Sequence, residues 1–322
     1  MKMENETIGL SPKKTYIIIG VALIVQLLIT TLISWAIFLP LNDPAKFQDF
    51  MIRFGPSFAF GLTYIPKLIG VVAFWLIVRK IPVFKGKAPG LGFKNIFQIF
   101  LITYAVAVTF NVIGANISAF SPAGKSVELD QISSFVSTGN IVAILIPVLF
   151  APVLEELVFR KMILGRTKGF GETTAIVFSS LCFGLFHQNL TQFMFAFVLG
   201  LFLGYVYCKT GKVIVTIIMH MLINGFSSVI MFIMPMFGKT VTPAFILTVV
   251  LLVITSMAMI ISGIILFIKW LRNRRFTPDN SMAICIPKRD VLATVYVNPA
   301  VITYIAICIA AIVIAFMNIK LF

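Results

Sequence analysis

Charged residues are scarce in this 322-residue chain: they make up 11% of it, whereas 60% of the residues are hydrophobic. The mean hydropathy is +1.05, which excludes a water-soluble globular protein, in which about a quarter of the residues are charged. Only 11 acidic residues accompany 26 lysine and arginine residues, so the formal net charge is +15. Because the basic residues lie between long apolar runs, we interpret the excess as membrane topology and expect no nucleic-acid partner.

Cysteine is also rare, with four residues and no CxxC pair. The four lie mostly in or beside apolar segments: Cys182, Cys208, Cys285 and Cys308. This distribution argues against a disulfide framework and against a thiolate metal cluster. We therefore expect free thiols.

Apolar stretches long enough to cross a membrane are frequent. About 20 helical residues cross the hydrocarbon core, and this length predicts nine spans, near residues 15–40, 57–79, 95–117, 141–165, 172–188, 190–208, 212–234, 243–270 and 300–319. The runs lack the period-two alternation of a transmembrane barrel, so they indicate an all-α fold, a polytopic transmembrane helical bundle of about eight or nine spans. The first span is too long for a secretory signal peptide, and we expect it to be retained.

Basic residues are distributed unevenly among the predicted loops. One set of alternate loops holds most of the 26, and the opposite set holds only Lys46, Arg53, Lys125, Lys239 and Lys320. Basic loops stay on the cytoplasmic side, so we predict a cytoplasmic N-terminus and a basic cytoplasmic loop at 271–299. Lys67 lies inside the second span, where we expect it to snorkel or to pair with a polar backbone group. The spacing of Gly200 and Gly204 predicts a close helix contact.

Few ionisable residues lie inside the predicted spans, where a charge near the bilayer centre costs at least ~2.5 to 3.5 kcal/mol. The acidic residues there are Glu155 and Glu156, and both histidines of the chain, His187 and His220, lie in apolar sequence. Arg160 follows Glu156 by four residues, so the two share a helix face and can form an ion pair. Glu155, about 100° away, is left for another role. The alternative is that these three residues only begin a solvated helix end.

Two further pairs have the same spacing. His220 and Asn224 share one helix face and present adjacent hydrogen-bond donors, and Phe183 precedes His187 by four residues. Each histidine alone is more simply explained as a core residue bonded to a neighbouring helix. Taken together with the glutamate pair, the polar positions on three helices predict one shared site, because burying each of them separately is costly.

The ordered motifs Glu155-Glu156-x3-Arg160, Phe183-x3-His187 and His220-x3-Asn224 resemble those of the CPBP family of intramembrane proteases. That family includes the CAAX prenyl endopeptidases and the bacterial Abi-type, bacteriocin-processing relatives. The resemblance covers about residues 141–234, and we expect a four-helix, CPBP/CAAX-protease-like catalytic core there. It is flanked by N-terminal transmembrane helices in 1–140, about three spans, and by C-terminal transmembrane helices in 235–322.

The resemblance implies an intramembrane peptidase, of glutamate or metallo-endopeptidase type, that acts on a membrane-associated protein or peptide in the bilayer. It implies Glu155 as the base that activates water, a role that burial of a carboxylate favours. His220 and Asn224 would donate to the developing oxyanion, and His187 would hold the water or pass a proton to the leaving amine. Glu156, Arg160 and Phe183 would support them. The expected location is the bacterial cell membrane.

Metal dependence stays open at this level. No cofactor is expected, because Asn224 is a poor zinc ligand and the chain has no HExxH motif. The other possibility is a zinc ion held by Glu155, His187 and His220.

Two other functions are compatible with intramembrane glutamate and histidine residues. A non-catalytic immunity or scaffold protein of the same fold could bind a peptide or a partner enzyme without cleaving it. A proton-coupled transporter could use these residues as a proton relay, although the chain shows no internal repeat of the kind transporters carry.

Overall fold

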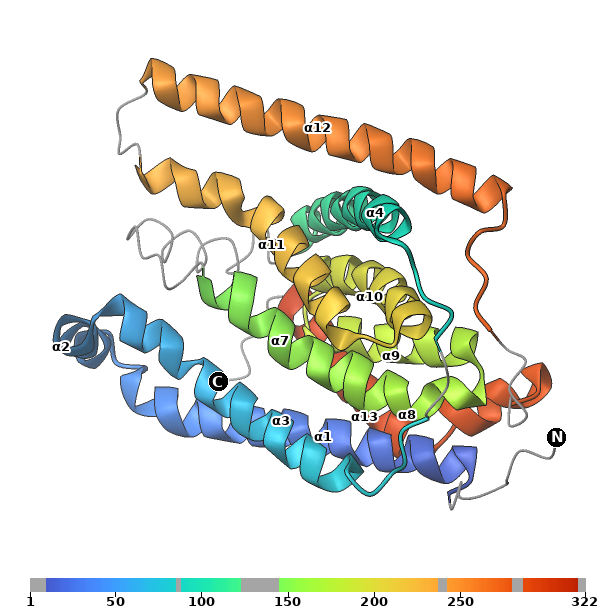
Figure 1. The fold of residues 1–322 in the computed structure, drawn as a ribbon. Helices are drawn as coiled ribbons and strands as arrows, with labels where there is room; N and C mark the ends of the chain where they lie inside the picture. Colours follow the sequence, from blue (N-terminus) through green and yellow to red (C-terminus); the bar gives the residue numbers. More distant parts are fainter. Residues whose placement is uncertain (1–9, 85–87, 123–144, 237–241, 280–285, 318–322) are drawn as a thin grey trace.

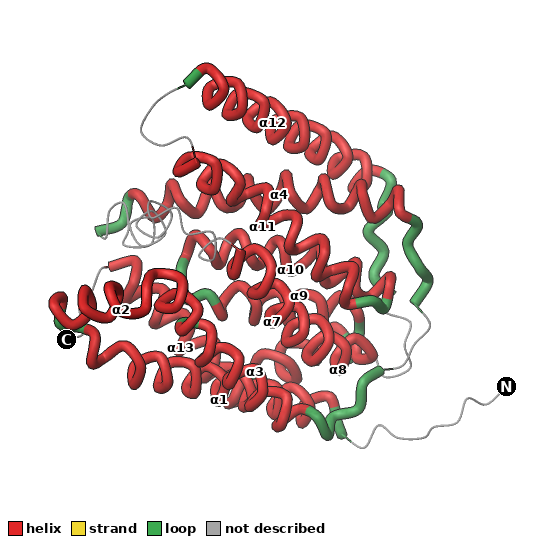
Figure 2. Tube along the Cα trace, turned by 60° about the vertical axis from the view of Figure 1, so that its left-hand side comes forward, coloured by secondary structure: helices red, strands yellow, loops and turns green. Residues whose placement is uncertain are grey.

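The computed structural model describes residues 10–84, 88–122, 145–236, 242–279 and 286–317, and every regular element in these ranges is a helix (Figures 1 and 2). The α-helices are α1 (Pro12–Phe38), α2 (Pro44–Leu62), α3 (Tyr64–Val78), α4 (Phe93–Ala119), α7 (Ala151–Glu156), α8 (Gly165–Thr167), α9 (Glu172–Phe186), α10 (Leu190–Thr210), α11 (Val213–Met236), α12 (Pro243–Arg272) and α13 (Pro299–Met317). Two π-helical stretches, η2 (Ile146–Phe150) and η3 (Leu157–Leu164), adjoin α7. The predicted helical bundle is therefore confirmed.

Six described helical segments are long and apolar enough to span a membrane: Pro12–Leu41, Ser57–Val78, Phe93–Ala119, Leu190–Thr210, Pro243–Arg272 and Pro299–Met317. Two shorter apolar helices, Glu172–Phe186 and Val213–Ser228, correspond to the predicted spans 172–188 and 212–234. The predicted span 141–165 corresponds to the run from η2 to η3, and its residues 141–144 lie outside the described part. The chain is a multi-pass membrane protein, and the cytoplasmic N-terminus stays a prediction.

Helix α2 is the element that the apolar-run analysis does not predict. Its first half carries the exposed ion pair of Asp49 and Arg53, with 3.0 Å between Oδ2 and Nε, so it forms no continuous apolar run. Gly55 interrupts it with a φ of 76°, a left-handed conformation that glycine adopts without strain. The following segment joins α3 as the second span.

Helices α9 and α10 form a tightly packed antiparallel hairpin. A Cβ atom at Gly200 would lie 2.9 Å from Cβ of Ser180, and one at Gly204 would lie 3.2 Å from Cγ2 of Ile176. The contact predicted from the small-residue spacing is therefore confirmed, and it lies against α9. The Asn189 side chain accepts from Gln192 N at 3.1 Å and caps α10 at the turn between the two helices.

The helix that carries the glutamate pair lies between two groups of helices. Helix α3 packs on α1 and η3, α11 packs on α7 and η2, and α9 packs on η3. Figure 1 shows α7 in green beside α3 on one side and α11 on the other. Residues of α3, α9 and α11 can therefore reach the glutamate pair.

The basic loop predicted at 271–299 is described except for residues 280–285. It folds back onto the start of α9, where Oε2 of Glu172 accepts from the Asp279 backbone N at 2.6 Å and Ile286 N donates to Phe170 O at 3.0 Å. The same Glu172 oxygen accepts from Lys209 Nζ at 3.0 Å. Cys182, Cys208 and Cys308 are free and buried, as expected, and Cys285 lies outside the described residues.

Candidate active site

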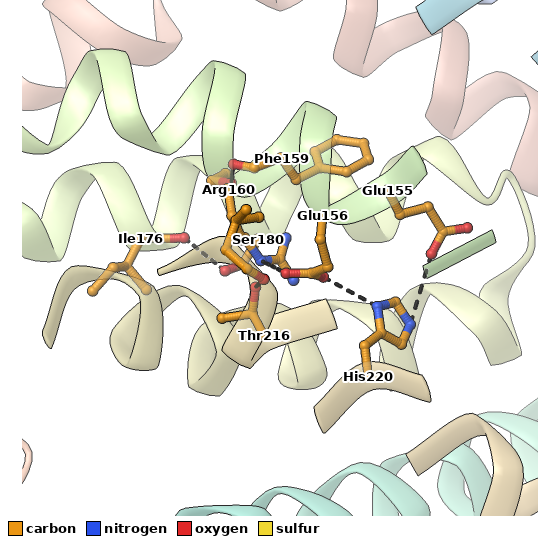
Figure 3. Close-up of polar contacts among 10 residues, drawn as sticks. Glu155, Glu156, Phe159, Arg160, Ile176, Ser180, Thr216 and His220 are labelled. Atoms are coloured by element: carbon orange, nitrogen blue, oxygen red, sulfur yellow. Dashed lines mark hydrogen bonds and ion pairs between the residues drawn. The ribbon is translucent and has the colours of Figure 1, made fainter. Parts of the chain in front are cut away.

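Glu156 lies at the centre of a fully buried polar cluster (Figure 3). Its Oε2 is 3.1 Å from Arg160 Nε, and both side chains are 0% exposed. Its Oε1 is 3.1 Å from Nδ1 of His220, and the Thr216 side chain lies beside this carboxylate, with its hydroxyl donating to Val213 O at 2.9 Å. A buried charge is tolerated when it is paired and hydrogen-bonded. This environment gives Glu156 a structural task and joins α7 to α11.

Arg160 completes the pair without satisfying all of its own donors. Its contact with Glu156 has ion-pair distance but not hydrogen-bond alignment, and Nη1 and Nη2 have no hydrogen-bond partner among the described residues. The guanidinium carbon lies 4.8 Å from the ring centroid of Phe183. A cation over an aromatic face is attracted by the negative ring face, so Phe183 compensates part of the lost hydration.

His220 lies between the two glutamates. Its Nδ1 faces Glu156, while its Nε2 is 3.7 Å from Oε2 of Glu155. Figure 3 shows the imidazole with one carboxylate on each side. The ring is 2% exposed, so it links the buried ion pair electrostatically to the second carboxylate, which lies too far for a direct hydrogen bond.

Glu155 lies on the opposite side of His220 from Glu156, and its carboxylate faces the imidazole, as Figure 3 shows. Its side chain is 17% exposed and lines a small cavity whose wall includes Leu154, Val158 and Phe186. The cavity has room for about one water molecule. One glutamate of the pair is therefore fully engaged by the protein, and the other is accessible.

Phe183 lies between the two histidines. Its ring centroid is 5.3 Å from that of His187 and 5.8 Å from that of His220. His187 is the C-cap residue of α9, and its ring is hydrogen-bonded to the Gln192 side chain. Among the described residues His187 makes no hydrogen bond or ion pair with Glu155, but the two are close enough to interact electrostatically. His187 thus lies beside the cluster, with the Phe183 ring between it and His220.

Asn224 is partly engaged elsewhere. Its Nδ2 donates to the Pro147 carbonyl in η2 at 3.2 Å, and one amide N–H remains because the group has two. The residue joins α11 to the start of the glutamate-bearing helix. His220 and Asn224 are thus on one face of α11, but their partners differ. His220 contacts Glu156 in α7, and Asn224 bonds to Pro147 in η2.

The predicted zinc ligands are not gathered as a three-ligand set. No group of three His, Cys, Asp or Glu side chains that could hold a metal ion occurs in the described ranges. In particular, both ring nitrogens of His220 face carboxylates, and His187 bonds to Gln192. The zinc site predicted from Glu155, His187 and His220 is therefore not assembled as a three-ligand set in the described residues.

Two features of the site were not predicted from the sequence. Thr216 is 0% exposed and lies beside Glu156; the sequence signal that could have found it is its position four residues before His220. Lys67, which we expected to snorkel or to pair with a polar backbone group, is exposed. Its Nζ lies 4.4 Å from the Tyr64 ring centroid, and the residue lines the cavity with Glu155. No pattern in the sequence links Lys67 to Glu155.

The family model described as type II CAAX prenyl endopeptidase Rce1-like matches residues 137–226. "Putative membrane peptidase YdiL" of Bacillus subtilis (strain 168) is 31% identical over 87 residues, which cover 26% of this chain and 34% of that protein. The chain thus covers about a third of the length of the curated relative it matches. No solved structure matches the chain. These matches confirm the resemblance to the CPBP family and support a membrane protease in general.

Proposed function

We propose that this protein is an intramembrane endopeptidase that hydrolyses a peptide bond of a membrane-associated protein or peptide with water activated by Glu155. The observation that carries the proposal is that the two adjacent glutamates have different environments. Glu156 is fully buried and paired with Arg160 and His220, whereas Glu155 lines a cavity and has no hydrogen bond within the cluster. A carboxylate that is held near a water-sized space and is not saturated by partners can act as a base.

The chemistry uses residues already in position. The Glu155 carboxylate takes a proton from water while the water oxygen attacks the peptide carbonyl carbon, and the carbonyl electron pair moves onto oxygen. The remaining amide N–H of Asn224 donates to that oxyanion. His220 adds a second donor, Nε2–H, in its imidazolium form, because its Nδ1–H is directed to the Glu156 carboxylate. Collapse of the intermediate breaks the C–N bond, and the proton on Glu155 goes to the leaving amine. His187 would orient the water.

The supporting residues fix this geometry. Glu156 and Arg160 hold His220 in place from one side, and Phe183 separates the two imidazoles. The low-polarity surroundings strengthen each electrostatic contact. We propose that the helices of 141–234 form the catalytic core and that the flanking helices complete it.

The test is comparative peptidomics of membranes that contain the wild type or the Glu155→Gln variant. The expected result is a set of cleavage products that is present with the wild type and falls by ~10²-fold or more with the variant, at equal protein level. Asp49→Asn is the matched control, because Asp49 is an exposed carboxylate on α2, outside the cluster. Products that persist at wild-type level with Glu155→Gln would refute the base role.

The same experiment separates the alternative functions. An immunity or scaffold protein would keep its protective or binding phenotype with Glu155→Gln and yield no product with either form. A transporter would lose uptake rather than cleavage. Only a peptidase makes the product set depend on Glu155.

A further inference from the structure

The cavity beside Glu155 has a second side, formed by α1 and α3. Gln26 comes from α1, and Tyr64 and Lys67 come from α3. These residues lie outside 137–226, the segment that the family model matches. Figure 1 shows α1 and α3 in blue alongside the green helix that carries Glu155. The flanking helices therefore add polar groups to the site.

Gln26 presents an unpaired acceptor at this wall. The residue is 2% exposed, and its Oε1 has no hydrogen-bond partner among the described residues. The close approach of α1 to α3 holds it, because a Cβ atom at Gly70 would lie 3.2 Å from Cγ of Gln26. A buried acceptor without a donor costs about 1 to 3 kcal/mol. A ligand with an N–H group would remove that cost.

Lys67 presents a cation at the same cavity. Its Nζ lies over the Tyr64 ring at 4.4 Å from the centroid, and no carboxylate lies within 4.0 Å of it in the described part of the chain. The residue belongs to a membrane span, where an unpaired charge is costly and marks a functional site. Besides Tyr64, the nearby charged or titratable groups are Glu155 and His187, which interact with it at longer range. The cation is thus available for an anionic group.

The rest of the cavity wall is apolar and includes Val71, Leu154 and Phe186. Gln26 offers an acceptor for an N–H group, Lys67 offers a cation for an anionic oxygen, and the remaining wall is apolar. Together these groups are complementary to a particular kind of peptide segment. That segment has a backbone amide, an apolar side chain and a carboxylate.

We propose that Gln26 and Lys67 are specificity-determining residues: Gln26 accepts a backbone N–H of the substrate, and Lys67 binds a substrate carboxylate close to the bond that Glu155 attacks. This inference rests on the proposed function, since it assumes that the occupant is a peptide. The carboxylate can be the end of the chain or an acidic side chain. Both sources share the chemistry that Lys67 recognises.

Binding measurements test this without turnover. Full-length Glu155→Gln protein in nanodiscs is titrated with three fluorescent probes: an N-acetylated apolar pentapeptide with a free terminal carboxylate, its terminal amide, and the same amide with one glutamate residue. We expect at least one carboxylate probe to bind about tenfold more tightly than the plain amide, as for a hydrogen bond to a charged group. The preferred carboxylate probe identifies the source of the carboxylate.

Variants added to this background assign the effect. Lys67→Met should abolish the advantage of the carboxylate probe, and Lys67→Arg should retain it. Gln26→Leu should weaken all three probes by a similar factor, because all three carry backbone N–H groups. Lys80→Met is the matched control, since Lys80 is an exposed lysine just beyond the same helix and outside the cavity. It should leave all three affinities unchanged.

Three outcomes overturn the inference: no probe binds, the plain amide binds as tightly as both carboxylate probes, or the carboxylate advantage survives Lys67→Met. Failure of the proposed function is a separate result, namely product formation that does not depend on Glu155. Binding and cleavage therefore test the two proposals independently.

Discussion

Nδ1 of His220 lies 3.1 Å from Oε1 of Glu156, 64 residues earlier in the chain. This contact connects two helices and fixes the imidazole so that its other nitrogen faces Glu155 at 3.7 Å. The adjacent glutamates thereby acquire different tasks. Glu156 holds the site together, and Glu155 is left at the cavity.

Replacing Glu156 should therefore mainly lower the stability of the protein, because Glu156 takes no direct part in the proposed reaction. Glu156→Gln leaves Arg160 as a buried unpaired cation, and we expect the free energy of unfolding to fall by about 3 to 5 kcal/mol. Thermal unfolding in detergent measures the change. Glu155→Gln is the comparison. Because the Glu155 side chain is partly exposed, this variant should lower the free energy of unfolding much less.

A double variant checks the cause. Glu156→Met with Arg160→Met removes both charges at once, so it should recover a large part of the lost stability. If the double variant is as unstable as Glu156→Gln, the unpaired charge is not the source of the effect.

Asn224→Ala should impair cleavage through kcat. The side chain supplies one donor to the proposed oxyanion, and removing such a donor lowers kcat by roughly 10²- to 10³-fold. Steady-state kinetics on a substrate found by peptidomics would measure it. An increase in KM with unchanged kcat would instead mean that Asn224 only anchors η2 through Pro147.

Gly200→Val should destabilise the α9–α10 hairpin. A Cβ atom there would lie 2.9 Å from Cβ of Ser180, and overpacking of this kind costs about 1 to 3 kcal/mol. Unfolding in detergent should show the loss, with Gly61→Ala as the control, because no atom lies within 4 Å of a Cβ there. Equal stability of the two variants would contradict the close helix contact.

Chelation should leave cleavage unchanged. The mechanism proposed here routes no step through a metal, and the described carboxylate and imidazole groups form no three-ligand set. Product formation is measured after dialysis against EDTA and again after zinc is added back. Loss on chelation with recovery on zinc addition would refute the metal-free mechanism.

The sequence alone determined those features that depend on neighbours in the chain. Hydropathy over about 20 residues located the membrane spans, and helix periodicity predicted the pair of Glu156 and Arg160. The small residues Gly200 and Gly204 correctly indicated a close contact, although not with which helix. Helix α2 was missed because its charged first half and the break at Gly55 leave no apolar run to detect.

Only the tertiary structure decided which helices meet. It brought Gln26 and Lys67 to the cavity of Glu155, and it directed Asn224 to the Pro147 carbonyl. Lipid tails are as apolar as the helix surfaces, so hydrophobicity gives little preference for one helix partner over another. Side-chain packing and a few polar contacts across long sequence separations make that choice, and no local pattern in the sequence encodes them.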